Sequence, residues 1–359
     1  MTRTYRPFLA AKRGETSALG MLTAAQWANL EPVMRVPPRE KDWDNGGWKK
    51  SDENHLQAVA DNLVKHLGSH PFLIDMAPFG SEALVKGKHP LEWMLAELTA
   101  RSCKVRCLVR PTSSVATMAL ARAHHLSTGL GLGAYIGPSD WETGPSPAAR
   151  AFLVSAGIAA SDMDVFLDAG PAPATNSAAD VDMEIDSVVA GHAYRSVSSG
   201  SAGFIDSSTI PKGITLHPRT DLATWLSTRG LRLTAGKSNI DFFDYGVENP
   251  WYAPEPVNPA FISIGALFRY TAGSSWVLPK GPDLFKGPNG TSQGGKAIVP
   301  ALTQLVSHAL YRDVVSTPAD DWIDSVVSKV KEGGNPEGWR KWASLRHVLV
   351  TRRQVSNLP

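Results

Sequence analysis

Short apolar runs rich in β-forming residues alternate with longer segments of helical periodicity along the first part of the chain. Such alternation is typical of parallel βα units, in which each strand is followed by a helix that packs on the sheet. We count eight runs, the number of strands that closes a (β/α)8 barrel. The runs are Tyr5–Leu9, Glu31–Val36, Phe72–Met76, Val105–Val109, Leu132–Ile136, Asp164–Leu167, Arg195–Ser198 and Leu231–Thr234.

The segments between the runs carry the apolar stripe of amphipathic helices. Leu56, Leu63 and Leu67 belong to one stripe with i, i+3, i+4 spacing, and Pro90 is well placed in the first turn of the next helix. The predicted fold is therefore an α/β, TIM-like (β/α)8 barrel with a C-terminal extension. An open doubly wound sheet would show the same alternation, so it stays the alternative.

The alternation of strand-like and helical segments ends after about Asn239. A Pro- and aromatic-rich stretch, an apolar run over Phe261–Phe268, a Gly-rich loop and two more helical stripes follow. Because no linker composition separates these segments from the rest, we expect residues 1–245 to form the barrel and residues 246–359 to form an extension packed on it.

Composition bounds the class of protein. Of 359 residues, 43% are hydrophobic and 19% are charged, a balance that excludes wholesale disorder. The net charge of +2 gives no strong global attraction to nucleic acid or anionic membranes. No stretch approaches the roughly 18 apolar residues of a membrane span. With only two cysteines and no signal-peptide pattern, we expect a cytoplasmic protein without membrane contact.

The C-terminal segment is locally basic. Between Lys329 and Pro359 there are seven Lys and Arg residues against two Glu. The simpler interpretation is the solvated face of a helix, and the other is a tail that contacts a nucleic acid or protein partner.

Polar residues stand at or just beyond the ends of several predicted strands. In a (β/α)8 barrel these ends and the loops after them form the active-site face. Carboxylates and cations that converge there are costly to bury unless they pair with one another or bind a ligand. Two interpretations therefore remain: a ring of structural ion pairs that closes the barrel, and a ligand-binding site. The residues are Lys12, Arg13, Glu15, Asp75, Arg110, Asp168, Asp244 and Tyr245.

The residue types narrow the chemistry that such a face could perform. Lys12, Arg110 and Arg269 could hold a phosphate or carboxylate group, since guanidinium offers two parallel donors. The three aspartates could act as general acid or base, or hold Mg²⁺ through oxygen ligands. No His stands at a strand end and no Cys set is complete, which argues against a zinc site.

Two loops offer weaker signals. Gly290–Lys296 has the spacing of a phosphate-binding P-loop, but Ala297 replaces the Ser or Thr that binds Mg²⁺, so a surface loop is favoured. The loop Arg39–Lys50 mixes Trp43 and Trp48 with basic residues beside the predicted active face. Such a loop can stack on a nucleotide, or serve as a lid anchored by its aromatic rings.

Several segments resemble the phage and bacterial beta protein family. The similarity spans nearly the whole chain and implies the architecture, but it carries no mechanism. The segments are Tyr5–Leu9 with Lys12–Glu15, Glu31–Pro38, Phe72–Asp75, Val165–Gly170, Phe243–Gly246, Phe268–Thr271 and Trp339–Arg353.

The function predicted from these features is binding of an anionic, phosphate-containing small molecule or nucleotide, with hydrolysis or transfer as the reactions that the residues permit. The alternative is a non-catalytic binding protein of phage–host conflict or anti-phage defence, which recognises a protein or nucleic acid. A third interpretation assigns nucleic-acid contact to the basic C-terminal tail.

Overall fold

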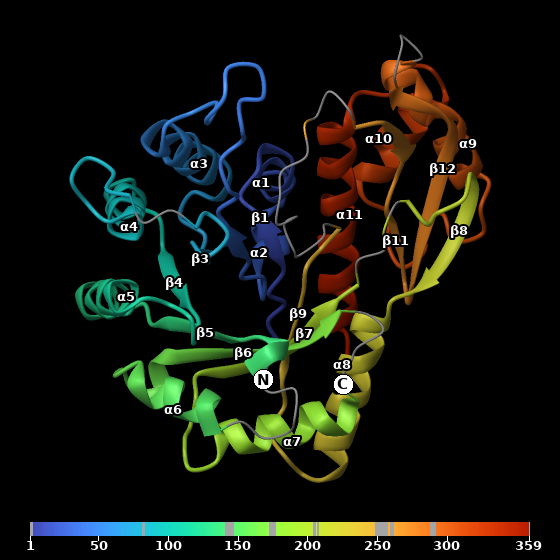
Figure 1. Cartoon of the computed structure of the whole chain (residues 1–359). Coiled ribbons are helices and arrows are strands. Elements are labelled where there is room, and N and C mark those ends of the chain that lie inside the picture. Colours follow the sequence, from blue (N-terminus) through green and yellow to red (C-terminus); the bar gives the residue numbers. More distant parts are fainter. Residues whose placement is uncertain are drawn as a thin grey trace.

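The first sheet of the computed structural model has eight parallel strands in the order β1-β2-β3-β4-β5-β6-β7-β9 (Figure 1). The structure describes residues 3–80, 83–140, 147–171, 177–203, 206, 208–247, 258, 262–287 and 292–358. The strands are β1 Phe8–Ala10, β2 Val33–Arg35, β3 Phe72–Asp75, β4 Val105–Val109, β5 Leu132–Ile136, β6 Met163–Pro171, β7 Ser196–Ala202 and β9 Asp241–Asp244.

The first and last strands meet, and their contact closes the sheet into a barrel. Tyr5, just before β1, forms a parallel bridge with Phe242 of β9, and the Arg6 amide donates to the Phe242 carbonyl at 2.9 Å. Closure leaves no open edge between β1 and β9, as a (β/α)8 barrel requires. The predicted fold class is confirmed, and the open sheet is excluded.

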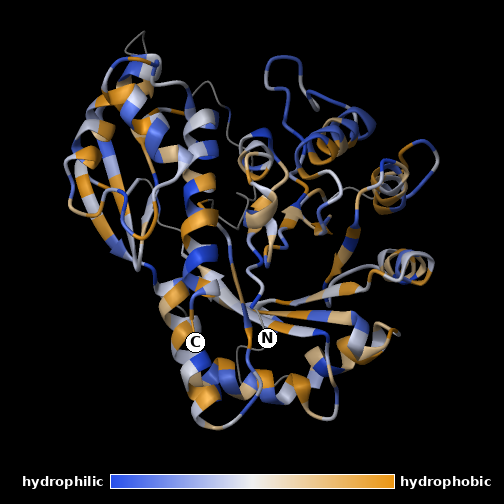
Figure 2. Cartoon of the chain, turned by 180° about the vertical axis from the view of Figure 1, so that it is seen from behind, coloured by the Kyte–Doolittle hydropathy of each residue, from blue (hydrophilic) through white to orange (hydrophobic). Residues whose placement is uncertain are grey.

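The helices on the outside of the barrel bury the predicted stripes. Leu56, Leu63 and Leu67 of α3 are all buried, and Pro90 begins α4. In Figure 2 hydrophobic and hydrophilic segments alternate along these helices. The helices are α1 Arg13–Leu19, α2 Ala24–Trp27, α3 Asp52–Leu67, α4 Pro90–Ala100, α5 Val115–Thr128, α6 Pro147–Ser155, α7 Ala178–Val189 and α8 Thr220–Thr234, with short 3-10 turns at η1 Pro138–Asp140 and η2 Ala160–Asp162.

The prediction of the eighth strand was wrong. Leu231–Thr234 lies in the last turn of α8, whose helical stripe buries Leu222 and Trp225 and leaves Leu231 exposed. Its alternation of polar and apolar residues imitates a strand over four positions only. The strand that closes the barrel is β9, with buried Phe242 and Phe243.

Side chains fill the barrel interior in layers, because alternate residues of each strand point inward. The middle layer is apolar: Phe8, Val33, Leu73, Leu108, Phe166 and Phe243. Gly200 of β7 is required here, since a Cβ at this position would lie 2.0 Å from the Phe243 carbonyl oxygen. Polar inward residues lie on either side of this layer, at the two ends of the barrel.

A second, antiparallel sheet lies beside the barrel. β12 pairs with β8 on one side and with β10 and β11 on the other. Its elements are β8 Gly213–Pro218, β10 Ile264–Leu267, β11 Tyr270–Ala272, β12 Ser275–Lys286, η5 Gly294–Ile298, α9 Val299–Val306 and α10 Pro318–Val327. The division of the chain at residue 245 stays a prediction, and β8, which precedes it, belongs to this sheet.

Helix α11, Pro336–Ser356, runs between the barrel and the second sheet (Figure 1). Leu345 and Val348 pack in the core of the barrel side, whereas Trp339 and Ala343 pack in the core of the other side. The middle of the basic C-terminal segment, residues 343–351, is thus a buried joint, and of its seven cations only Arg346 is buried. The first and last described residues lie together, as the Arg3 guanidinium donates to the Leu358 carbonyl at 2.6 Å. Within the described ranges, each helix is too short or too polar to cross a membrane.

Candidate functional site

The carboxyl ends of the barrel strands gather a compact polar cluster, which we call the mouth cluster. Each member is an inward-pointing residue near the carboxyl end of its strand or follows that end directly, as the alternation along each strand dictates. Its members are Arg35, Asp75, Arg110, Tyr135, Asp168 and Tyr245.

One half of the mouth cluster is an acid held by two arginines. Asp75 is fully buried, and its Oδ2 lies 2.5 Å from the Arg110 guanidinium and 3.7 Å from that of Arg35. The Arg110 guanidinium also lies 4.1 Å from the centre of the Tyr135 ring. Burial lowers the pKa of Arg110, but Asp75 outweighs it and raises the pKa, so this arginine stays charged. The positive charge of Arg110 is thus largely compensated by the Asp75 carboxylate.

The other half is an acid held by two tyrosines. The Asp168 carboxyl contacts the hydroxyls of Tyr135 and Tyr245, the latter at 2.6 Å, and the two hydroxyls lie 2.8 Å apart. The Gly170 amide donates to the other carboxyl oxygen at 2.9 Å. Burial raises the pKa of Asp168 and outweighs these hydrogen bonds, which act in the opposite direction. Burial likewise raises the pKa of both tyrosines, so their hydroxyls keep their protons.

Asp244 points out of the barrel and does not join the mouth cluster. It accepts from Tyr5 at 2.8 Å, from Arg219 at 3.2 Å and from the Gly246 amide at 3.0 Å, and it lies 2.9 Å from His347 Nε2. Burial raises the pKa of Asp244, but His347 and Arg219 outweigh it and hold this pKa below its usual value. The aspartate therefore anchors α11 and the second sheet to the barrel.

The remaining predicted residues lie farther out. Arg13 forms a two-point ion pair with Glu337 at 2.5 and 2.8 Å on the surface, and buried Glu15 lies 3.5 Å from Arg340. Lys12 precedes α1 and faces solvent-accessible space beside the mouth. Arg269 lies apart from all of these, in a cavity of about 500 Å³ between the second sheet and α11.

A cleft of about 810 Å³ opens beside the mouth, between the loop after β1 and the loop after β2. We call it the basic cleft, because seven of its lining residues are cations and two are acids. Trp43 adds an aromatic ring, 4.6 Å from the Lys41 ammonium. The charged lining residues are Lys12, Arg13, Arg39, Lys41, Lys49, Lys50, Arg340, Glu40 and Glu337.

Ion pairs use part of this charge. Arg39 pairs with Asp52 at 2.6 Å, and Lys49 pairs with Glu40 at 3.1 Å. Among the described residues, the seven cations stand against four carboxylates, namely Glu15, Glu40, Asp52 and Glu337. The basic cleft is thus electropositive, and it lies on the face where barrel enzymes bind their ligands.

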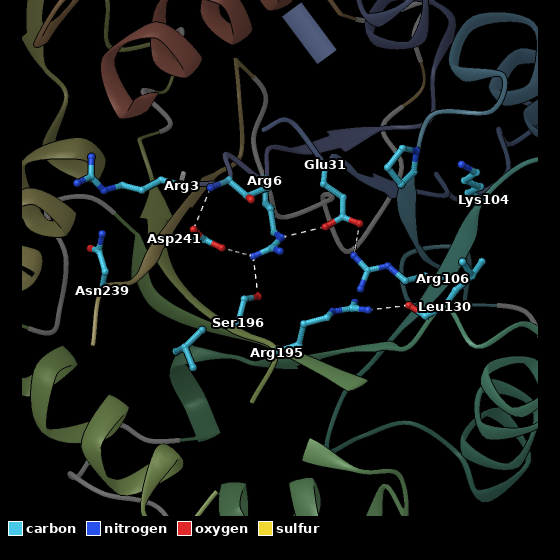
Figure 3. Close-up of a pocket in the computed structure, with 13 residues that line it drawn as sticks. Arg3, Arg6, Glu31, Lys104, Arg106, Leu130, Arg195, Ser196, Asn239 and Asp241 are labelled. Carbon is cyan, nitrogen blue, oxygen red and sulfur yellow. Dashed lines mark hydrogen bonds and ion pairs between the residues drawn. The ribbon is translucent and has the colours of Figure 1, made fainter. Parts of the chain in front are cut away.

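A different cavity, of about 490 Å³, lies at the opposite end of the barrel (Figure 3). There Arg6 reaches Glu31 at 3.2 Å and Asp241 at 2.7 Å, and Arg106 reaches Glu31 and buried Asp164. Arg6, Arg106 and Arg195 alternate with Glu31, Asp164 and Asp241 and compensate them, and Arg3 and Lys104 also line the cavity. At the amino-terminal end of the strands, such a network closes the barrel bottom and contributes to stability.

The donor set for a metal ion is weak. Among the described residues, no three His, Cys, Asp or Glu side chains converge in a way that could hold one. Asp75 is engaged by two arginines and Asp168 by two tyrosines. Because cations and hydroxyl protons occupy these oxygens, the mouth cluster does not fit Mg²⁺.

Sequence reasoning missed two members of the mouth cluster. Arg35 ends a predicted strand just as Asp75 does, so the same criterion could have found it. Tyr135 lies inside an apolar run, and only the count of alternate positions from Gly133 shows that it points inward. His347 lies on helix α11, and Arg219 lies just before helix α8. No local sequence pattern at either position indicates a contact with Asp244.

The comparisons with known proteins show the family to which this chain belongs. The model of the beta protein family matches residues 5–352, nearly the whole chain. The chain belongs to the beta protein family. Among solved structures, this family member is similar to a type I 3-dehydroquinate dehydratase from Clostridium difficile, crystallised with covalently modified comenic acid. The identity is 10% and the TM-score 0.39, over 69% of this chain and 86% of the other. A search of curated proteins found no match.

Proposed function

We propose that this beta protein family member binds an anionic, phosphate-containing small molecule or nucleotide in the basic cleft. The observation that carries the proposal is the surplus of cations in a cleft of about 810 Å³ beside the barrel mouth. This volume lies within the range of small-molecule sites, which is about 300–1,000 Å³.

The lining residues support a phosphate rather than a plain apolar ligand. Lys12, Lys41 and Lys50 can each act as a point charge for phosphate oxygens, and Arg39 can offer a planar pair of donors. The Trp43 ring provides a surface on which a nucleobase can stack. Of the cations predicted to bind the ligand, Lys12 and Arg13 line this cleft, whereas Arg110 forms an ion pair with Asp75.

Thermal unfolding with a panel of inorganic phosphate, ATP and malonate at fixed ionic strength tests the proposal. A ligand that binds only the folded state stabilises it by about 2.7 kcal/mol at one hundred times its dissociation constant. We expect phosphate and ATP to raise the melting temperature of the wild type and malonate to have a smaller effect.

The variant Lys41→Met/Lys50→Met should lose most of this shift, because it removes two cleft cations. The control Lys65→Met/Lys212→Met removes two exposed cations outside the cleft and should keep the shift. The proposal fails when no compound shifts the wild type, or when the two double variants respond alike. A single-stranded oligonucleotide that shifts the wild type more than ATP would point to nucleic acid instead.

A further inference from the structure

Three oxygen atoms at the barrel mouth form a closed triangle. Asp168 Oδ2 contacts the hydroxyl oxygens of Tyr135 and Tyr245, and the two hydroxyl oxygens lie 2.8 Å from each other. Every edge of this triangle has the length of an O–H···O hydrogen bond or is shorter. All three side chains are buried, so solvent does not separate them.

The number of hydrogen atoms decides the charge of the triangle. Each edge needs one hydrogen, and the two tyrosines together supply two. With an ionised Asp168, both hydroxyls would donate to the carboxylate, and the contact between Tyr135 and Tyr245 would bring lone pairs together without a hydrogen. A protonated Asp168 supplies the third hydrogen, because a carboxylic acid is a donor as well as an acceptor. The three groups can then donate around the ring.

We propose that Asp168 is a neutral carboxylic acid at neutral pH and acts as the proton donor for a ligand oxygen at the barrel mouth, with Tyr135 as the relay. Asp168 Oδ2 passes its proton to the Tyr135 oxygen while the Tyr135 hydroxyl proton passes to the ligand oxygen. The ligand gains one proton, and Asp168 becomes a carboxylate that accepts from both tyrosines. No other reactant is needed.

The surroundings favour this role. Burial raises the pKa of Asp168, which favours the same protonated form as the hydrogen count of the triangle. The charged groups that face the triangle are Arg110, over the Tyr135 ring at 4.1 Å, and Arg35, over the Tyr245 ring at 5.6 Å, with Asp75 between the two arginines. The arginines stabilise the carboxylate once the proton has left. The Arg110 side chain is 20% exposed, so a ligand can reach this side of the cluster.

The identity of the acceptor rests on the proposed function, because the ligand meant is one that extends from the basic cleft beside the mouth toward Arg110 and Tyr135. The protonation of Asp168 rests on the triangle alone. The two parts can therefore fail separately.

Infrared spectroscopy of the protein labelled with ¹³C-aspartate tests the protonation. We expect the C=O band of a protonated carboxylic acid at pH 7, which disappears in Asp168→Asn and persists in the control Asp44→Asn, whose exposed acid lies on the surface. If Asp168→Asn does not fold, alkaline titration of the wild type must remove the band instead. Absence of the band at pH 7 overturns the proposal.

The affinity for sulfate, an anion that does not titrate over this range, tests the donor role. Between pH 7 and the alkaline pH where the infrared band is lost, the ratio of the sulfate affinity of the wild type to that of Asp168→Asn should fall severalfold, because only the wild type gains a negative charge at this position. A ratio that does not change with pH shows that Asp168 does not face the anion. Failure of both proteins to bind sulfate overturns the donor role together with the proposed function, and leaves the infrared result standing.

Discussion

Residues of the mouth cluster form ion pairs and hydrogen bonds with one another, and these partners decide which chemical role each residue can have. Asp75 is compensated by Arg110 and Arg35, whereas Asp168 contacts two tyrosine hydroxyls and the Gly170 amide. These two aspartates, one at the carboxyl end of β3 and the other in β6, therefore have chemically different partners, and this allows their roles to differ.

The pair between Arg110 and Asp75 predicts a large effect on stability. Arg110→Met removes the nearest cation from a fully buried carboxylate, and breaking a buried pair costs about 3–5 kcal/mol. Arg110→Met/Asp75→Asn should recover much of this loss, since no charge is then left unpaired. Urea unfolding of the two single variants and the double variant measures the coupling. Additive losses would show that the pair contributes nothing.

Local sequence predicts most strands and helices of the barrel, but it does not predict the closing strand β9. The stripes of α3 and α4 and seven of the eight strands are readable, because period and burial agree over many residues. Leu231–Thr234 misled because four residues are too few to distinguish a strand from the end of a helix. The strand β9 is only four residues long, and its pairing with β7 and Tyr5 depends on contacts far apart in sequence.

Helix α3 allows a direct test of the packing. Leu63 is completely buried in the core between the helix and the barrel strands, so Leu63→Ala should lower the free energy of unfolding by about 2–5 kcal/mol. Val154 of α6 is 66% exposed, and Val154→Ala should change the free energy of unfolding by less than about 0.5 kcal/mol. Chemical denaturation compares the two. Equal effects would mean that the α3 stripe does not face the core.

The whole molecule joins a barrel and an antiparallel sheet through α11 and a buried polar contact. His347 of α11 lies 2.9 Å from Asp244 and 2.9 Å from Thr271 of β11, and its ring stacks on Trp276 of β12 at 4.9 Å. Sequence alone predicted Asp244 as a site residue, since it follows the predicted eighth strand. Its outward direction could not be foreseen, because the partners come from elements that the barrel pattern does not predict.

The contact between Asp244 and His347 predicts an acid-sensitive joint. A carboxyl group whose pKa is lowered in the folded state contributes stability above its unfolded pKa of about 3.9, and this contribution is lost as the pH falls through the folded value. Wild type should exceed Asp244→Asn in stability at pH 7, and the difference should shrink below about pH 4. Unfolding curves from pH 7 to pH 3 measure it. A difference that is constant with pH would show that the carboxylate charge is not what stabilises the joint.

The central claim is that the basic cleft holds a phosphate-containing anion, and calorimetric titration of ATP into the wild type tests it most directly. We predict saturable binding that weakens with salt, that is reduced at least tenfold in Lys41→Met/Lys50→Met, and that is unchanged in Lys65→Met/Lys212→Met. Absence of binding to the wild type, or equal binding by the two double variants, would contradict the account.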